Sequence, residues 1–314
     1  MQTTGVHQLK RASLEVPRLT LARPLHRKYS VRRRYTYVGL LATGYFAIAL
    51  TALAAERRNE SACATDTNIS ADQTIDGCTK YLQDRADRSN EQTAVAYVIR
   101  GQGYSLKNDL DRAIADFDKA IELNPKSSDG FRFRGLAHFS KQDYERALTD
   151  FNSAILLRPN YRSAYYNRAL VFLAKEDLTQ AGADLDEAAR IGPRTSNIIF
   201  LRATVYKNQK DWKHAIELFG GVIDDKAAVN RNIALVERGL AYMKLGQEFR
   251  AIGDFDRVVR EFSSFGYGYY ARASFYEERG DLARAMEDCG MGIRYNPGLR
   301  DENKRCSRLI EKHR

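Results

Sequence analysis

The sequence contains none of the common short motifs of catalysis or metal binding. It has no HExxH, CxxC, P-loop or GxSxG pattern, so it gives no support for zinc peptidase, dithiol, phosphate-binding or hydrolase chemistry. Histidine is scarce, with five residues in the chain, and these form no catalytic constellation. We therefore predict no catalytic residue, no cofactor and no metal site.

Net charge is nearly absent beyond residue 34. Residues 1–34 hold nine Lys and Arg residues against one acidic residue, Glu15, and so account for +8 of the formal +10. The remaining chain is close to neutral, which gives no electrostatic case for a nucleic-acid-binding surface. We predict that residues 1–34 form a disordered basic tail that precedes a targeting segment.

Long uncharged runs are equally scarce, and the one that bears on targeting is residues 35–55. Two interpretations remain open. The segment is a signal peptide cleaved after Ala52-Leu53-Ala54, or it is an uncleaved membrane anchor of about 20 residues. Both place the rest of the chain outside the cytoplasm, because the basic side stays inside. We expect an exported protein, either periplasmic or anchored in the inner membrane.

Only four cysteines are present, in two pairs near opposite ends of the chain. Cys63 and Cys78 form one pair, and Cys289 and Cys306 form the other. An even number and pairwise proximity favour one disulfide at each end, among three possible connectivities. The alternative for Cys289 is a free thiol that packs as a small apolar side chain.

What the chain does contain is a 34-residue period. A small residue follows an arginine at positions 101, 135, 169, 203, 239 and 273, and four of the five intervals are 34 residues. Alanine recurs twelve residues later, and a large apolar residue or cysteine four residues after that. Self-similarity at this period is typical of a solenoid in which each unit packs against its neighbours.

Within each unit the apolar residues mark two amphipathic helices joined by a tight turn. With the units begun at residues 94, 128, 162, 196, 232 and 266, positions 4, 8 and 11 share one helix face, and positions 20, 24 and 27 share another. Aspartate at position 16 is a favourable N-cap for the second helix in five units, whereas Gln247 is a poorer one.

This pattern resembles the tetratricopeptide repeat (TPR) family over residues 94–299. The likeness rests on the bulky residue at position 4, the small residue at 8, the aromatic at 11, the alanine at 20 and the proline at 32 of four units. The resemblance implies an all-α fold, an α-solenoid of six helix-turn-helix repeats. The predicted repeats are 94–127, 128–161, 162–195, 196–231, 232–265 and 266–299.

Cap helices are expected at both ends, because the first and last repeats would otherwise expose an apolar face. Residues 56–93 contain a linker and a predicted cap helix over 71–88, which begins with the capping box Ser70-Ala71-Asp72-Gln73. Residues 300–314 form the second cap helix, whose apolar stripe contains Cys306, Leu309 and Ile310.

One recurrent feature departs from the common family pattern. Position 7 is arginine in all six units, and position 23 is aspartate in five, a variant that resembles exported bacterial TPR proteins. We predict structural ion pairs between the two positions, with a row of anion sites as the alternative. The predicted pairs are Arg100 with Asp116, Arg134 with Asp150, Arg168 with Asp184, Arg238 with Asp254 and Arg272 with Asp288.

Repeat 4 is irregular. Leu218 replaces the aspartate expected opposite Arg202, Gly220-Gly221 weaken the second helix, and the unit is two residues longer than the others. Either this is drift that the solenoid tolerates, or it is a bend that shapes a binding surface.

The resemblance also implies a binding surface on the first helix of each repeat. Positions 2, 5, 9 and 12 of TPR units line the concave face, which here is predicted to be an apolar groove. The predicted partner-binding residues are Arg132, Leu136, Phe139, Tyr166, Leu170, Leu173, Phe200, Lys207, Leu240, Met243, Tyr267 and Tyr270. The alternative for each is packing between adjacent first helices.

We therefore expect a non-enzymatic scaffold or adaptor that binds a peptide or helix of another protein. An accessory subunit of an envelope enzyme or of a secretion or assembly complex is a more specific version of the same role. An enzyme and a nucleic-acid binder are the remote alternatives. Membrane association through residues 35–55 belongs to the anchor interpretation, and the sequence does not indicate an oligomeric state.

Overall fold

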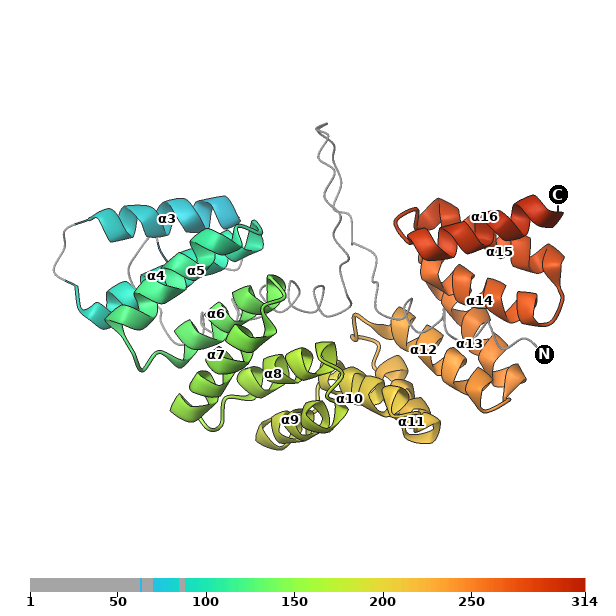
Figure 1. Ribbon diagram of the computed structural model, residues 1–314, viewed down its shortest axis with the longest axis horizontal. Coiled ribbons are helices and arrows are strands. Elements are labelled where there is room, and N and C mark those ends of the chain that lie inside the picture. The colour runs from blue at the N-terminus through green and yellow to red at the C-terminus, as the bar shows by residue number, and fades with distance from the viewer. Residues whose placement is uncertain (1–62, 64–69, 85–87, 314) are drawn as a thin grey trace. The chain divides into compact units, whose positions relative to one another are not determined.

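The structure, a computed structural model, describes residues 63, 70–84 and 88–313 (Figure 1). The predicted basic tail, the apolar stretch 35–55 and residues 56–62 lie outside the described residues. Within the described ranges the regular elements are fourteen α-helices and there is no strand. None of these fourteen helices is long and apolar enough to cross a membrane.

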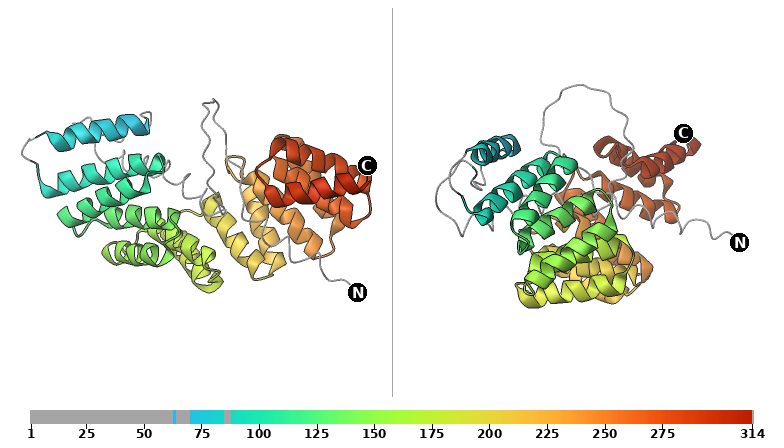
Figure 2. Two further views of the ribbon diagram at one scale, coloured as in Figure 1. Left: turned by 45° about the horizontal axis from the view of Figure 1, so that its top comes forward. Right: turned by 60° about the vertical axis from the view of Figure 1, so that its left-hand side comes forward.

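The described residues form two compact units that divide between Gly192 and Pro193 (Figures 1 and 2). The N-terminal unit contains α3 (Ala71–Gln83), α4 (Asn90–Leu106), α5 (Leu110–Leu123), α6 (Ser128–Ser140), α7 (Tyr144–Leu157), α8 (Arg162–Ala174) and α9 (Leu178–Ile191). The C-terminal unit contains α10 (Ser196–Asn208), α11 (Trp212–Asp224), α12 (Arg231–Lys244), α13 (Glu248–Glu261), α14 (Gly266–Glu278), α15 (Leu282–Tyr295) and α16 (Arg300–His313).

Each predicted repeat folds as a helical hairpin. The two helices of a repeat pack against each other, and within a unit the second helix packs against the first helix of the next repeat. The aspartates at position 16 accept a backbone N–H of the first turn, as predicted for Asp109, Asp143, Asp177, Asp211 and Asp281. Gln247 makes no side-chain cap bond, which confirms that it is a poorer cap. The fold class is therefore all-α with TPR-type hairpins.

The hairpin turn depends on one residue with positive φ, which the sequence pattern alone did not reveal. Position 15 has φ between 60° and 75° in all six repeats. Glycine occupies it in two repeats, at Gly246 and Gly280, and this left-handed conformation costs glycine little. The residues with side chains at this position are Asn108, Gln142, Glu176 and Lys210.

Small residues at position 8 allow the two helices of a hairpin to approach closely. A Cβ atom placed on Gly101 would lie 2.6 Å from the ring of Phe117, and one on Gly239 would lie 2.5 Å from Phe255. Both phenylalanines are completely buried. The period of small and aromatic residues therefore reflects direct contact between positions 8 and 24.

The N-terminal end of the repeats is covered by α3, which begins with the predicted capping box at Ser70. The helix ends at Gln83 rather than Arg88, because Asp84 has an extended backbone (φ −64°, ψ 131°). Cys78 of α3 is completely buried and is bonded to Cys63, and the pair packs against Ala96 and Ile99 of α4. The disulfide thus joins Cys63 to the cap helix α3, and the bonded pair packs on the first helix of repeat 1.

The C-terminal end is covered by α16, which packs against α15. Cys306 and Leu309 face inward, and Cys306 is bonded to Cys289 at position 24 of repeat 6. A disulfide therefore stands where the other repeats place a phenylalanine or leucine in the core.

The predicted ion pairs form a regular ladder. In five repeats the arginine at position 7 binds the aspartate at position 23 of the same repeat through two hydrogen bonds. In repeat 3, Arg168 Nε and Nη2 lie 2.8 and 2.7 Å from the two carboxylate oxygens of Asp184. The other four pairs have the same geometry. The hydrogen bond to the carboxylate raises the pKa of each guanidinium.

The same guanidinium also reaches the preceding helix. Arg134 Nη1 lies 2.6 Å from Asp118, Arg168 Nη1 lies 2.6 Å from Asn152, and Arg272 Nη1 lies 2.8 Å from Asp256. These acceptors all occupy position 25 of the preceding repeat. Each of these arginines therefore connects a hairpin internally and fastens it to its neighbour.

The irregular repeat 4 differs from what the sequence suggested. Helix α11 runs unbroken through Gly220 and Gly221, and it packs against α12. The two compact units divide before repeat 4, between Gly192 and Pro193. The C-cap residues Asn124 and Arg158 have ψ of 87° and 88°, whereas Gly192 has ψ −176°. The backbone therefore leaves α9 in a different conformation from the one that follows α5 and α7.

We predict that both disulfides form in the native protein. Alkylation of the denatured protein should label no thiol before reduction and four thiols after it, because the chain has four cysteines. Cys306→Ser should lower the free energy of unfolding by about 3 kcal/mol, since the closed loop has a sequence separation of 17 residues. Labelling of Cys289 or Cys306 in the unreduced wild-type protein would contradict the pairing.

We predict that Gly220→Asn stabilises the C-terminal unit. Position 25 of repeat 4 is Gly220, and Arg238 Nη1 lies 3.4 Å from where its Cβ would stand. Asparagine there can accept the hydrogen bond that Asn152 accepts from Arg168. The free energy of unfolding should rise by about 1 kcal/mol from this bond and from better helix propensity.

The matched control is Gly221→Asn, because nothing lies within 4 Å of a Cβ at Gly221. It gains helix propensity alone. The difference between the two variants should vanish in an Arg238→Met background, as denaturant titration can show. Equal stabilisation by both variants in the wild-type background would mean that Arg238 does not bind at this position.

We predict that His138 makes the N-terminal unit less stable in mild acid. The side chain is buried at an aromatic position, and burial lowers its pKa below the usual 6.5 although Asp150 lies 3.9 Å away. The unfolded chain then binds the proton more readily, so stability is full above pH 6.5 and falls as the pH drops below it. His138→Phe should remove this part of the pH dependence in thermal melts between pH 5 and 8. An unchanged profile would contradict the assignment.

Candidate partner-binding surface

The first helices of successive repeats are neighbours within each unit. In the N-terminal unit α4 packs against α6 and α6 packs against α8, and in the C-terminal unit α12 packs against α14. Side chains at equivalent positions of these helices therefore lie in rows. Such rows are the structural basis for the predicted partner-binding surface.

Most of the predicted binding residues are buried in the structure. Arg132, Leu136, Phe139, Tyr166, Leu170, Phe200, Tyr267 and Tyr270 are all at most 8% exposed. The prediction that these eight residues form an open apolar surface is therefore wrong for the structure described here. Leu173, Lys207, Leu240 and Met243 remain partly exposed.

Packing partners explain several of these burials. Phe200 meets Phe219 of α11 with ring centroids 5.5 Å apart, and Phe139 meets Tyr144 of α7 at 5.9 Å. The Tyr270 hydroxyl donates to the Asn296 carbonyl at 3.3 Å. Large side chains at positions 5 and 12 thus reach neighbouring parts of the repeats. These side chains therefore belong to the core as well as to the concave face.

Lys207 does not contribute an isolated charge. Its Nζ lies 3.0 Å from Glu237 Oε2, and Glu237 is 2% exposed. Glu237 is not among the residues predicted from the sequence. The repeat numbering could have indicated this ion pair, because the acid at position 6 of one repeat faces position 12 of the repeat before it.

Arg132 belongs to a polar cluster that connects α6 to the loop before α8. Its Nε donates to the Tyr161 hydroxyl, which in turn donates to Asp129. Arg158 lies 3.3 Å from the same carboxylate, and the Arg132 guanidinium lies 3.8 Å from the ring centre of Phe133. Burial raises the pKa of Tyr161 to about 12, so its hydroxyl remains protonated as a donor.

The ladder arginines do not act as open anion sites. Each of the five guanidiniums described above already holds a carboxylate through two hydrogen bonds, and the aspartates are at most 6% exposed. Arg202, opposite Leu218, contacts Tyr206, with its guanidinium carbon 4.9 Å from the ring centre. The geometry therefore favours the structural interpretation of this feature.

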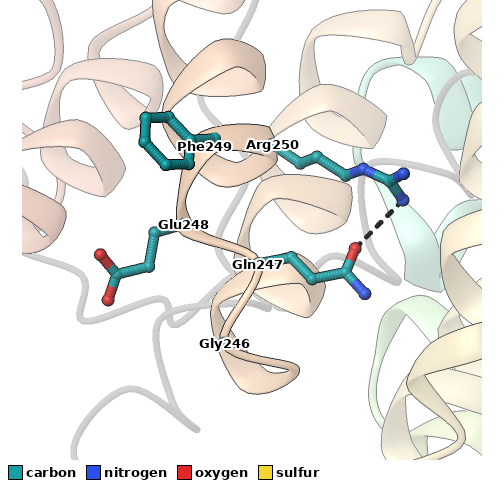
Figure 3. Close-up of a pocket in the computed structure, with 5 residues that line it drawn as sticks. All are labelled: Gly246, Gln247, Glu248, Phe249 and Arg250. Carbon is teal, nitrogen blue, oxygen red and sulfur yellow. Dashed lines mark hydrogen bonds between the residues drawn. The ribbon is translucent and has the colours of Figure 1, made fainter.

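Neither of two surface depressions that lie on the described residues gathers catalytic groups. The larger, of about 490 Å³, is lined by Gly246–Arg250 at the turn before α13. Figure 3 shows that the Phe249 and Glu248 side chains point away from the Gln247–Arg250 pair. The smaller, of about 170 Å³, is lined by His138, Ile114 and two pairs of opposite charge, Lys141 with Asp111 and Arg146 with Asp143. Across the described residues no group of His, Cys, Asp and Glu is arranged to hold a metal ion.

Comparison with known proteins agrees with this architecture. Family models described as tetratricopeptide repeat match residues 94–127 and 234–264, and a model described as TPR repeat matches residues 135–176. No curated protein sequence is significantly similar to the chain.

Among solved structures, a tetratricopeptide repeat protein from Parabacteroides merdae aligns with a TM-score of 0.60 at 15% identity, over 86% of this chain and 99% of its own. The Cut9–Hcn1 hetero-tetramer of the APC/C aligns with a TM-score of 0.60 at 16% identity, over 86% of this chain and 53% of that chain. PilF of Pseudomonas aeruginosa aligns with a TM-score of 0.58 at 16% identity, over 70% of this chain and 99% of its own. These likenesses show the fold alone. The matching repeat models, with the hairpins and their caps, show that residues 94–127, 135–176 and 234–264 are tetratricopeptide repeats within an all-α TPR solenoid.

Proposed function

We propose that the protein is a non-enzymatic scaffold or adaptor of the cell envelope, and that its first-helix rows bind a segment of another protein. The observation that carries this proposal is the row itself. Within the N-terminal unit α4, α6 and α8 lie side by side, as α12 and α14 do in the C-terminal unit, so a partner segment can contact several repeats at once. TPR repeat proteins are generally scaffolds rather than enzymes.

The envelope location is supported by two features. Both pairs of cysteines are bonded, and structural disulfides persist mainly in oxidising compartments. The basic residues 1–34 followed by the uncharged stretch 35–55 have the order of an export signal or anchor. A role as accessory subunit of an envelope enzyme or assembly complex is one specific use of such a scaffold.

We expect a photocrosslinking residue at Leu173 to capture a partner in living cells. Leu173 lies on α8 and is partly exposed, whereas Ala183 is exposed on the second helix α9 of the same repeat. The two positions therefore compare the two sides of one hairpin. Substitution of Leu173 by benzoylphenylalanine should give a discrete adduct, and the same residue at Ala183 should not.

A fusion protein tests the predicted location of the repeats. Alkaline phosphatase fused after Arg314 should be active, because that enzyme folds only outside the cytoplasm. Adducts of equal yield from Leu173 and Ala183 would contradict binding on the first helices. An inactive phosphatase fusion, with a fluorescent cytoplasmic reporter at the same site, would contradict the envelope location without affecting the scaffold role.

A further inference from the structure

The hairpin turns of the N-terminal unit are tied to one another by ion pairs. The lysine at position 14 of one repeat binds an acid at position 18 of the repeat before it. Lys141 binds Asp111 in this way, and Lys175 binds Glu145. Positions 13–19 of repeats 1, 2 and 3 together hold five basic residues against six acidic ones. The turn edge of this unit is therefore close to neutral, and its charges are largely paired.

The turns of repeats 4 and 5, in the C-terminal unit, cannot form these pairs. Position 14 is Gln209 in repeat 4 and Leu245 in repeat 5, and neither side chain is charged. Position 18 is Lys213 in repeat 4 and Phe249 in repeat 5, where repeats 1 and 2 have an acid. The pairing that covers the turns of the N-terminal unit is therefore missing at these two adjacent turns.

Exposed apolar side chains stand at the same two turns. Phe249 is 93% exposed, more than any other large apolar side chain in the described part of the chain. Figure 3 shows that it points away from the Gln247–Arg250 pair beside it. Trp212 begins α11 and is partly exposed, as is Leu245. Helix α12 packs against both α11 and α13, so the two turns are neighbours.

Basic side chains flank these apolar groups. Positions 13–19 of repeats 4 and 5 hold four basic residues against two acidic ones, and the four are all exposed: Lys210, Lys213, Lys244 and Arg250. Of the two acids, Asp211 binds His214 and Glu248 binds Arg279. We call the four basic residues, with Phe249, Trp212 and Leu245, the turn patch. It combines a protruding aromatic ring with an excess of positive charge.

This combination matches the surface of an anionic bilayer. Aromatic rings enter the headgroup region of a membrane, and lysine and arginine are attracted to anionic lipids. A second copy of the chain fits the turn patch poorly, because the like charges repel. A protein partner fits less well than a membrane, because aromatic anchors of protein interfaces lie within a ring of side chains that excludes water. Phe249 is too exposed to have such a ring.

We propose that the turn patch docks on an anionic membrane surface. Phe249 and Trp212 lie among the lipid headgroups, and the four basic side chains lie at the lipid phosphates. This contact is separate from the membrane association predicted for residues 35–55. It goes beyond the scaffold function and does not depend on it. Because the turn patch lies at the hairpin turns, the same repeats keep their first-helix faces for a protein partner.

The test follows the fluorescence of Trp212, which is the only tryptophan in the chain. The full chain is mixed with vesicles of equal parts phosphatidylglycerol and phosphatidylcholine that carry bromine on their acyl chains, because bromine quenches tryptophan at short range. The emission of Trp212 should be quenched and shifted to the blue. Residues 1–55 contain no tryptophan, so their own binding to the vesicles does not produce this signal.

Variants assign the contact to the turn patch. Phe249→Ser should reduce the quenching about fivefold, and so should Lys210→Gln combined with Lys213→Gln. The matched controls are Leu156→Ser, at an apolar side chain of α7 that is 82% exposed, and Lys141→Gln, in the equivalent turn of repeat 2. Both controls should be quenched like the wild type. Circular dichroism checks that every variant remains folded.

An unquenched Trp212 would overturn the inference, whether or not the chain sediments with the vesicles. Equal quenching by brominated phosphatidylcholine alone would overturn it, and so would equal losses from Leu156→Ser and Phe249→Ser. Benzoylphenylalanine in place of Phe249 tests the other occupants in cells. A discrete protein adduct would assign the turn patch to a protein, and an adduct of twice the chain mass to a second copy. Neither outcome affects the adduct expected at Leu173, so the two proposals fail separately.

Discussion

The bidentate pair between the arginine at position 7 and the aspartate at position 23 is the interaction on which five of the six hairpins depend for their register. It joins residues 16 apart on the two helices, and in several repeats the third guanidinium nitrogen binds position 25 of the preceding repeat. Aromatic residues at positions 4 and 11 flank the charge, as Tyr165 and Phe172 flank Arg168. Such a half-buried pair gains little net stability, because desolvation offsets the attraction. Its main effect is on register, since a hairpin that slips leaves a buried carboxylate unpaired.

Much of the fold could be predicted from the sequence because the period reports direct contacts. The small residue at position 8 and the large one at position 24 touch in the structure, as Gly101 and Phe117 do. Aspartate at position 16 caps the second helix in five repeats, and the end helices bury Cys78, Cys306 and Leu309. The first two of these predictions rest on local physical requirements that recur from repeat to repeat along the chain.

The rest could not be predicted because it depends on contacts between repeats or on backbone conformation. Position numbers placed Phe200 and Tyr166 on an open face, but large side chains at position 5 are buried in this chain. The division at Gly192 has little local signal, since Pro193 occupies the same place as Pro125 and Pro159. The backbone of Gly192 is extended (φ −156°, ψ −176°), a conformation that other residues also adopt, so the residue type does not predict it.

The amides of Gln102 and Asn167 differ from the ladder, because they are buried without a hydrogen-bond partner among the described residues. Leaving a buried polar group unpaired costs about 1–3 kcal/mol, and a domain of ordinary stability has only about 5–15 kcal/mol in total. The ladder offsets the cost of its charges within the chain, because every carboxylate at position 23 meets its arginine. Gln102 and Asn167 have no such compensation among the described residues, although neighbouring repeats show that leucine or phenylalanine fits. The equivalent positions of neighbouring repeats hold leucine, isoleucine or phenylalanine, so the amides are a feature of these two repeats and not a requirement of the fold.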